Sequence, residues 1–152
     1  MKIAFLDTVH DVLENGLKEL GHDCVDFTKV SNESILNEIH HFEGIVVRSR
    51  LPLNEQFLSK CANLKFIARS GAGMENIDIS YCQKNGIELF NAPEGNRNAV
   101  AEHALGMLLS LFNNLNSGDA EVRSGKWDRE GNRGIELDGK KVGLIGFGNN
   151  GS

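Results

Sequence analysis

Two short segments of the sequence carry groups that could bind a small anion. Each follows an apolar run that predicts a buried strand, so each should lie at the carboxyl end of its strand. Guanidinium groups offer forked donors that match a carboxylate or phosphate, and small residues let consecutive backbone amides approach an anion. The predicted anion-binding residues are Arg48, Ser49, Arg69, Ser70, Gly71, Ala72 and Gly73.

Two simpler interpretations compete with this anion site. Asp7, at the end of the first apolar run, could pair with one of the two arginines. The small residues at 70–73 could also form an ordinary tight turn without a ligand. The position of this turn beside Arg69 at a strand end favours the binding interpretation.

A second candidate binding segment is GFGNNG at 146–151, which follows the apolar run 141–145. In a GxGxxG pattern the first glycine makes a tight turn, the second admits a dinucleotide pyrophosphate, and the third lets a helix pack on a strand. The following helix and the acidic residue about 20 positions on are not in the printed sequence. The segment is therefore half of a nucleotide-binding fingerprint.

The histidines and cysteines lack the context of catalytic or metal-binding groups. No histidine has an evident partner for proton transfer, and the three cysteines form no CxxC pattern. We therefore predict no metal site and no disulfide framework, which fits a reducing compartment. The residues concerned are His10, His22, His40, His41, His103, Cys24, Cys61 and Cys82.

The elements that must position these groups alternate between apolar strands and helix-period segments. Expected strands are 2–7, 22–28, 44–49, 64–70 and 87–91, and expected helices are 9–20, 31–42, 54–61 and 79–86. This alternation is typical of βαβ units and predicts an α/β fold with a doubly wound parallel sheet.

A hinge is expected at 91–96, where turn-forming residues interrupt the alternation. After it we predict an apolar helix over 99–115 with Asn98 as its N-cap, a more polar helix over 119–127, and a strand over 141–145. A helix as apolar as 99–115 should be covered on most sides.

The charge and hydrophobicity of the chain disfavour two classes of partner, nucleic acids and membranes. The chain has 152 residues, 40% of them hydrophobic, and a net charge of −5 with scattered basic residues. This balance disfavours a nucleic-acid partner, which requires a basic surface. No segment is apolar enough for a signal peptide or membrane span, so a cytoplasmic protein without a membrane partner is expected.

Several motifs, taken together, resemble the D-2-hydroxyacid dehydrogenases, and within that family most closely its 3-phosphoglycerate-oxidising branch. The motifs occur in the family's order and at its spacing over the whole chain. They are VVRS at 46–49, ARSGAGMENID at 68–78, NAPEGNRNAVAEHALGMLL at 91–109, GKWDR at 125–129 and LDGKKVGLIGFGNNG at 137–151.

The resemblance implies a two-domain oxidoreductase. Residues 1–94 would form a flavodoxin-like substrate-binding domain, and 95–152 the incomplete first part of a Rossmann NAD-binding domain. The reaction would transfer a hydride between NAD and a D-2-hydroxy acid, with 3-phosphoglycerate as the expected substrate and serine biosynthesis as the expected pathway. The sequence leaves open which 2-hydroxy or 2-oxo acid is used, and whether NAD or NADP serves.

The resemblance also assigns roles to residues. Backbone amides at 70–73 would bind the substrate carboxylate, Arg48 would lie near the substrate's far end, and Arg129 would reach a neighbouring subunit's site. Ala72 replaces a larger residue common in relatives, so no side-chain contact to cofactor is expected there. The expected NAD-binding residues are Asn96, Asn98, Gly146, Gly148, Asn149, Asn150 and Gly151. The helix at 99–115 would form a homodimer interface.

In that family the catalytic arginine, the acid and the histidine would lie beyond Ser152, so the printed chain is expected to be inactive by itself. An alternative is a non-catalytic flavodoxin-like binding module. A receiver domain is disfavoured because Thr8 follows Asp7 and the third strand ends in Arg48. A truncated subunit that docks on full-length copies is a further alternative.

Overall fold

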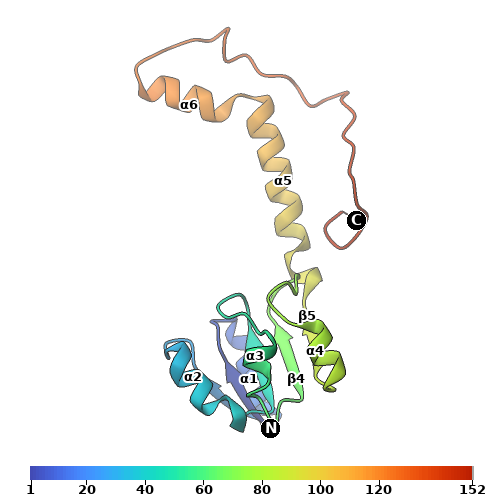
Figure 1. Cartoon of the computed structure of the whole chain (residues 1–152). Helices are drawn as coiled ribbons and strands as arrows, with labels where there is room; N and C mark the ends of the chain where they lie inside the picture. The colour runs from blue at the N-terminus through green and yellow to red at the C-terminus, as the bar shows by residue number, and fades with distance from the viewer. Residues whose placement is uncertain (152) are drawn as a thin grey trace. The chain divides into compact units, whose positions relative to one another are not determined.

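The computed structural model describes residues 1–151. The chain divides into two compact units, Met1–Gly95 and the segment from Asn96 onward (Figure 1). Among the described residues, no helix combines the length and the apolar character needed to cross a membrane.

The first unit contains a five-stranded parallel sheet. Its strands are β1 (Lys2–Phe5), β2 (Asp23–Asp26), β3 (Gly44–Val47), β4 (Phe66–Arg69) and β5 (Glu88–Asn91). They pair in the order β2-β1-β3-β4-β5, which is the flavodoxin-like order with its topological switch point between β1 and β3. The predicted doubly wound α/β fold is confirmed.

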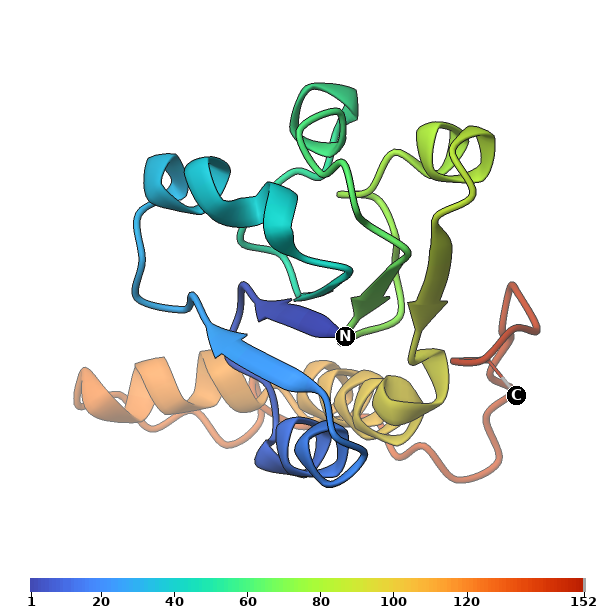
Figure 2. The ribbon, with the colours of Figure 1, turned by 90° about the horizontal axis from the view of Figure 1, so that it is seen from below.

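Helices cover both faces of this sheet. Figure 2 shows α2, α3 and α4 on one face and α1 on the other. Right-handed crossovers require this division, because the chain moves outward from β1 in opposite directions. The helices are α1 (Asp11–Glu19), α2 (Asn32–Glu38), α3 (Glu55–Leu58) and α4 (Ile79–Lys84), with 3₁₀ turns η1 (Ile39–His41) and η2 (Pro93–Asn96).

Among residues 1–151, the hydrophobic core lies entirely within the first unit, between Ile3 and Ile87. Its larger part joins alternate strand residues such as Ala4, Ile45 and Ile67 to the helices after β2, β3 and β4. On the opposite face, Ile3, Phe5 and Val46 pack against Val9, Leu13 and Leu17. Strands β1 and β3 are therefore buried on both faces, which explains their continuous apolar sequences.

Side-chain caps fix where the helices of this unit begin. Ser31, Asn54 and Asp78 each accept a hydrogen bond from a backbone amide in the first turn of α2, α3 and α4. The imidazole of His10 does the same for Val12 at the start of α1. These caps set the directions of the chain as it leaves the carboxyl ends of the strands.

The second unit contains two helices whose bounds differ from the prediction. Helix α5 is Arg97–Phe112 and α6 is Leu115–Arg123. Asn96, rather than Asn98, is the N-cap of α5, so Asn98 lies in its first turn. The expected continuation to residue 115 is wrong because Asn114 adopts a left-handed conformation with φ 52°, which ends one helix and starts the next.

The predicted strand at 141–145 is also wrong. These residues form no ladder with another strand in the part of the chain that the structure describes, and Val142, Leu144 and Ile145 are exposed. A strand needs a hydrogen-bonding neighbour, and the five-stranded sheet pairs only residues of the first unit.

Candidate functional site

The sheet brings the two predicted anion-binding segments together at its carboxyl edge. Val47 and Arg69 are register partners at the ends of β3 and β4. The Ser70 amide donates to the Val47 carbonyl at 2.8 Å. Arg48 and Ser49 therefore lie beside residues 69–73, adjacent to the switch point where ligands bind in sheets of this kind.

Asp7 holds the backbone after β3. One carboxylate oxygen, Oδ2, accepts from the amides of Arg48, Ser49 and Arg50 at 2.6, 3.0 and 3.2 Å. Asp7 therefore binds the backbone of this loop, and the interpretation that it pairs with an arginine side chain is wrong. The side chains of Arg48 and Ser49 are exposed and make no hydrogen bond or ion pair within residues 1–151.

Arg50 is a structural residue of this edge that the sequence interpretation missed. Its Nη1 donates to the carbonyls of Leu6, Phe27 and Thr28 at 3.2, 2.7 and 3.0 Å. Its Nη2 donates to the Val30 carbonyl. The guanidinium thus ties the ends of β1 and β2 to the loop after β3. Nothing in the local pattern distinguishes Arg50 from Arg48, because its partners come from remote segments.

In the loop after β4, the carbonyls of Gly71 and Ala72 are bound, whereas the neighbouring amides of Ala72 and Gly73 are free. The Gly71 carbonyl accepts from the Ala92 amide at 2.9 Å, and the Ala72 carbonyl accepts from Asn91 Nδ2 at 2.7 Å. Within residues 1–151, the amides of Ala72 and Gly73 donate to no other group. Two neighbouring free amides on an anchored backbone suit an anion.

The Arg69 guanidinium lies against this loop. A β-carbon added to Gly71 would lie 1.7 Å from Arg69 Nη1, so glycine is needed for the guanidinium to keep its place. Arg69 Nε is buried and has no hydrogen-bond partner among the described residues. Because an unsatisfied buried donor is costly, a bound anion at the guanidinium would offset that cost.

One acidic side chain lies close to the same loop. A β-carbon on Gly73 would meet the Glu75 carboxylate at 2.2 Å. Glu75 is exposed, so its side chain can turn toward solvent. An anion that binds the Gly73 amide requires this movement, because like charges repel at short range.

The glycines at 146–151 form a tight turn in the second unit. Gly146 has φ 101°, and a β-carbon on Gly151 would lie 2.2 Å from the Gly146 carbonyl oxygen. Both positions therefore need glycine, as the pyrophosphate-binding pattern requires. Gly148, Asn149 and Asn150 are exposed on this turn, and Asn96 and Asn98 are exposed at the start of α5.

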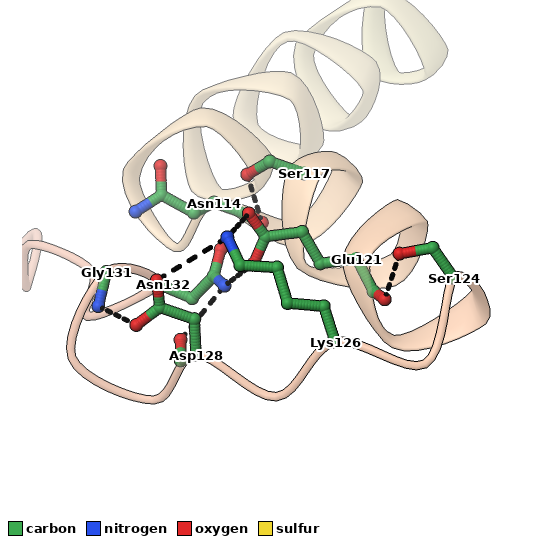
Figure 3. A network of polar contacts seen from close by, with 8 residues as sticks. All are labelled: Asn114, Ser117, Glu121, Ser124, Lys126, Asp128, Gly131 and Asn132. Carbon is green, nitrogen blue, oxygen red and sulfur yellow. Dashed lines mark hydrogen bonds and ion pairs between the residues drawn. The ribbon is translucent and has the colours of Figure 1, made fainter.

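Arg129 is exposed. The loop that carries it is fixed to α6 by the contacts of Lys126 and Asn132 with Glu121 (Figure 3). Glu121 of α6 binds Lys126 Nζ at 2.9 Å and Asn132 Nδ2 at 2.6 Å, and Asp128 accepts from the Gly131 amide at 2.8 Å. The hydrogen bonds from Lys126 and Asn132 lower the pKa of Glu121, and that with Glu121 raises the pKa of Lys126. These contacts hold the loop on both sides of Arg129.

The cysteines are not reactive thiols. Burial raises the pKa of Cys61 to about 12 and also raises that of Cys82 and Cys24. At neutral pH these side chains are protonated and weakly nucleophilic. No cluster of three or more potential metal ligands occurs within residues 1–151.

Comparison with known proteins places this geometry in a family. The pattern of the D-isomer specific 2-hydroxyacid dehydrogenase catalytic domain matches residues 3–148. D-3-phosphoglycerate dehydrogenase from Archaeoglobus fulgidus is 35% identical over 148 residues, which are 97% of this chain and 28% of the relative. The chain thus spans less than a third of the length of this relative.

Two solved structures share the fold. The NAD⁺-bound 3-phosphoglycerate dehydrogenase of Entamoeba histolytica is 29% identical with a TM-score of 0.75, over 99% of this chain and 48% of that protein. The NAD-dependent formate dehydrogenase of Staphylococcus aureus, in complex with NAD, is 25% identical with a TM-score of 0.81, over 99% and 51%. Because the family's catalytic-domain pattern matches residues 3–148, a range that includes most of the five-stranded sheet, the chain belongs to the D-isomer specific 2-hydroxyacid dehydrogenases.

Proposed function

We propose that the chain contributes the acid-binding domain and the entrance of the nucleotide-binding domain of an NAD-dependent dehydrogenase. Its substrate would be a D-2-hydroxy acid or the corresponding 2-oxo acid, with 3-phosphoglycerate favoured. The similarity to curated D-3-phosphoglycerate dehydrogenases supports this choice, and serine biosynthesis is the corresponding pathway.

The observation that carries the proposal is the pair of free amides at Ala72 and Gly73 beside Arg69. A carboxylate can accept from both amides while the guanidinium neutralises its charge. Arg48, Ser49 and Ser70 lie at the same edge, so the exposed Arg48 side chain is available for a second negative group at the substrate's far end.

NAD would be held by groups of the second unit. The turn at 146–151 fits a pyrophosphate because Gly146 has a left-handed backbone, Gly151 leaves no room for a side chain, and Gly148 adds no side chain to the turn. Gly146, Gly148, Asn149, Asn150 and Gly151 would contact the phosphates, and Asn96 and Asn98 the nicotinamide side. NAD, when bound, accepts or supplies the hydride, and the residues described here orient the acid.

We propose that the 152-residue chain binds the acid without oxidising it. Proton transfer at the hydroxyl needs a base within hydrogen-bond reach, and His10, at the same sheet edge, uses its Nδ1 to cap α1. His40 and His41 lie against each other with ring centroids 3.8 Å apart and ring planes tilted by 43°. The base would therefore come from elsewhere in the parent enzyme.

The assembly proposed for the chain is a cytoplasmic homodimer formed through α5. Apolar side chains are exposed along this helix, including Leu105, Met107 and Leu111. Exposed apolar surface of this kind is typical of a protein interface. Arg129, on its fixed loop, would reach the acid site of the neighbouring subunit.

Titration of the ¹⁵N-labelled chain with 3-phosphoglycerate tests the acid site. The amide signals of Ala72 and Gly73 are expected to move with the carboxylate, and those near Arg48 with the phosphate. D-lactate, which lacks the phosphate, should move only the first group. Shifts confined to other residues, or no shifts at millimolar acid, would contradict the proposal.

Gly71→Ala sharpens this test because the new methyl group displaces the Arg69 guanidinium. We expect affinity for 3-phosphoglycerate to fall about ten-fold, the effect of losing roughly one charged hydrogen bond. Gly16→Ala is the matched control, since a β-carbon there meets nothing within 4 Å. Equal affinities for the two variants would show that Arg69 does not take part.

A further inference from the structure

The loop after β3 is anchored from several directions at once. Asp7 Oδ2 accepts from three consecutive amides, those of Arg48, Ser49 and Arg50. Asn76 Nδ2 donates to the carbonyls of Arg48 and Leu51, both at 3.3 Å. The amides of residues 48–50 and the carbonyls of Arg48 and Leu51 are therefore bonded within the protein itself.

The Arg50 side chain completes this arrangement. Its guanidinium donates to carbonyls at the ends of β1 and β2, those of Leu6, Phe27, Thr28 and Val30. The loop is thereby joined to both neighbouring strand ends. The Asp7 carboxylate and the Arg50 guanidinium act on one short segment, and we call this pair the β3-loop brace.

The brace leaves the side chains of Arg48 and Ser49 free to meet a ligand. The Arg48 and Ser49 side chains are exposed and unbonded within residues 1–151, whereas both of their backbone amides donate to Asp7. A side chain that projects from a fixed backbone loses less freedom on binding than one on a mobile loop. The Arg48 side chain, held on this fixed backbone, is therefore suited to contact a ligand at a defined position.

Asp7 also determines which backbone amides an anionic substrate can use. Three consecutive amides form a nest that attracts an anion, and at 48–50 the protein's own carboxylate fills it. Among the described residues, the amides of Ala72 and Gly73 remain free, and they lie on the loop against which the Arg69 guanidinium packs. The substrate carboxylate is directed to that pair, and Arg48 is left for the other end.

We propose that Asp7, supported by Arg50, is a positioning residue that fixes Arg48 and sets the direction in which the acid binds. This inference rests on the proposed function for its ligand. Its structural half, the filled nest at 48–50, can be tested without any substrate.

The test compares wild type with Asp7→Ala in the 152-residue chain. The variant should bind 3-phosphoglycerate at least about ten-fold more weakly, because the loop that carries Arg48 loses its anchor. Sodium formate, a small carboxylate that fits the space of the lost group, should restore most of the affinity and return the Arg48, Ser49 and Arg50 amide signals toward wild-type positions. Wild type titrated in the same formate corrects for competition at the acid site.

Asp78→Ala is the matched control. The Asp78 side chain also accepts a backbone amide, that of Tyr81 at 2.9 Å, but it caps α4 and, within residues 1–151, makes no hydrogen bond to the loop after β3. The one bond from Asp78 to that loop, from its amide to the Leu53 carbonyl, is a backbone bond that the substitution keeps. The Asp78→Ala variant should be less stable than wild type, but it should bind 3-phosphoglycerate with wild-type affinity, and formate should affect it as it affects wild type. Equal affinity losses in the two variants, or no formate rescue of Asp7→Ala, would overturn the positioning role.

Two further observations distinguish a failure of the proposed function from a failure of the β3-loop brace. If wild type binds no acid but formate still restores the 48–50 amide signals of Asp7→Ala, the proposed function fails and the filled nest stands. If Asp7→Ala does not fold, amide exchange in wild type decides: protected Arg48, Ser49 and Arg50 amides support the brace, and rapid exchange at all three contradicts it.

Discussion

Glu121 is the residue on which the loop around Arg129 depends. It accepts hydrogen bonds from both Lys126 and Asn132, which flank Arg129 in the sequence. The pKa of Glu121 is lowered from 4.5, first by the hydrogen bond from Lys126 and then by that from Asn132. Because the pKa of Glu121 is lower in the folded chain than in the unfolded chain, its ionised carboxylate stabilises the loop at any pH above the unfolded-state pKa. This stabilisation is lost as the pH falls through the folded-state pKa.

The loop should therefore loosen on acidification below about pH 4.5. Trp127, the single tryptophan of the chain and 81% exposed, reports on it. We expect its fluorescence anisotropy to fall between neutral pH and pH 3. Glu121→Gln should have a lower anisotropy at neutral pH and a flatter profile. A variant profile that matches wild type would assign the transition to another carboxylate.

Residue types at the acid site were predictable, but their partners were not. Arg48, Arg69 and the small residues at 70–73 stand directly after apolar runs, so a parallel sheet must bring them to one edge. Asp7 and Arg50 bind groups at least 20 residues away in sequence. No local spacing encodes such contacts, because they depend on the strand order.

At the level of elements, α5 is apolar around most of its circumference. Its prediction as a helix was correct, and the error in its end arose from Asn114, whose left-handed backbone a helical periodicity does not reveal. The strand predicted at 141–145 failed for a different reason. A short apolar run forms a strand only where a neighbouring strand supplies hydrogen bonds.

Dimer formation through α5 gives a prediction at this scale. Leu111 is 73% exposed, and Leu111→Glu should convert a sedimenting dimer of the chain into a monomer, since a buried unpaired charge opposes association. Val122→Glu, at a 57% exposed position of α6, is the control and should remain dimeric. A wild-type monomer across micromolar concentrations would contradict the α5 interface.

For the whole molecule, stability resides in the first unit. Every buried hydrophobic residue among those described lies at or before Ile87, and the sheet is complete by Asn91. The hydrophobic effect is the dominant favourable term in folding, so the second unit contributes little to the cooperative transition.

A chain ending at Gly95 should therefore melt close to the midpoint of the full chain. The difference should stay below the ~4–8 °C that 1 kcal/mol causes in a domain of this size, measured by circular dichroism. A chain ending at Gly86, which lacks β5, should lose the cooperative transition. A large drop for the chain ending at Gly95 would show that the second unit stabilises the sheet.

The strand order has a consequence for synthesis on the ribosome. Every strand of the sheet pairs within residues 2–91, so the sheet and its acid-binding edge can form once that part has emerged. Domains generally fold as units, with the N-terminal one first. The nascent chain can thus acquire an acid-binding surface while the glycine turn at 146–151 is still being translated.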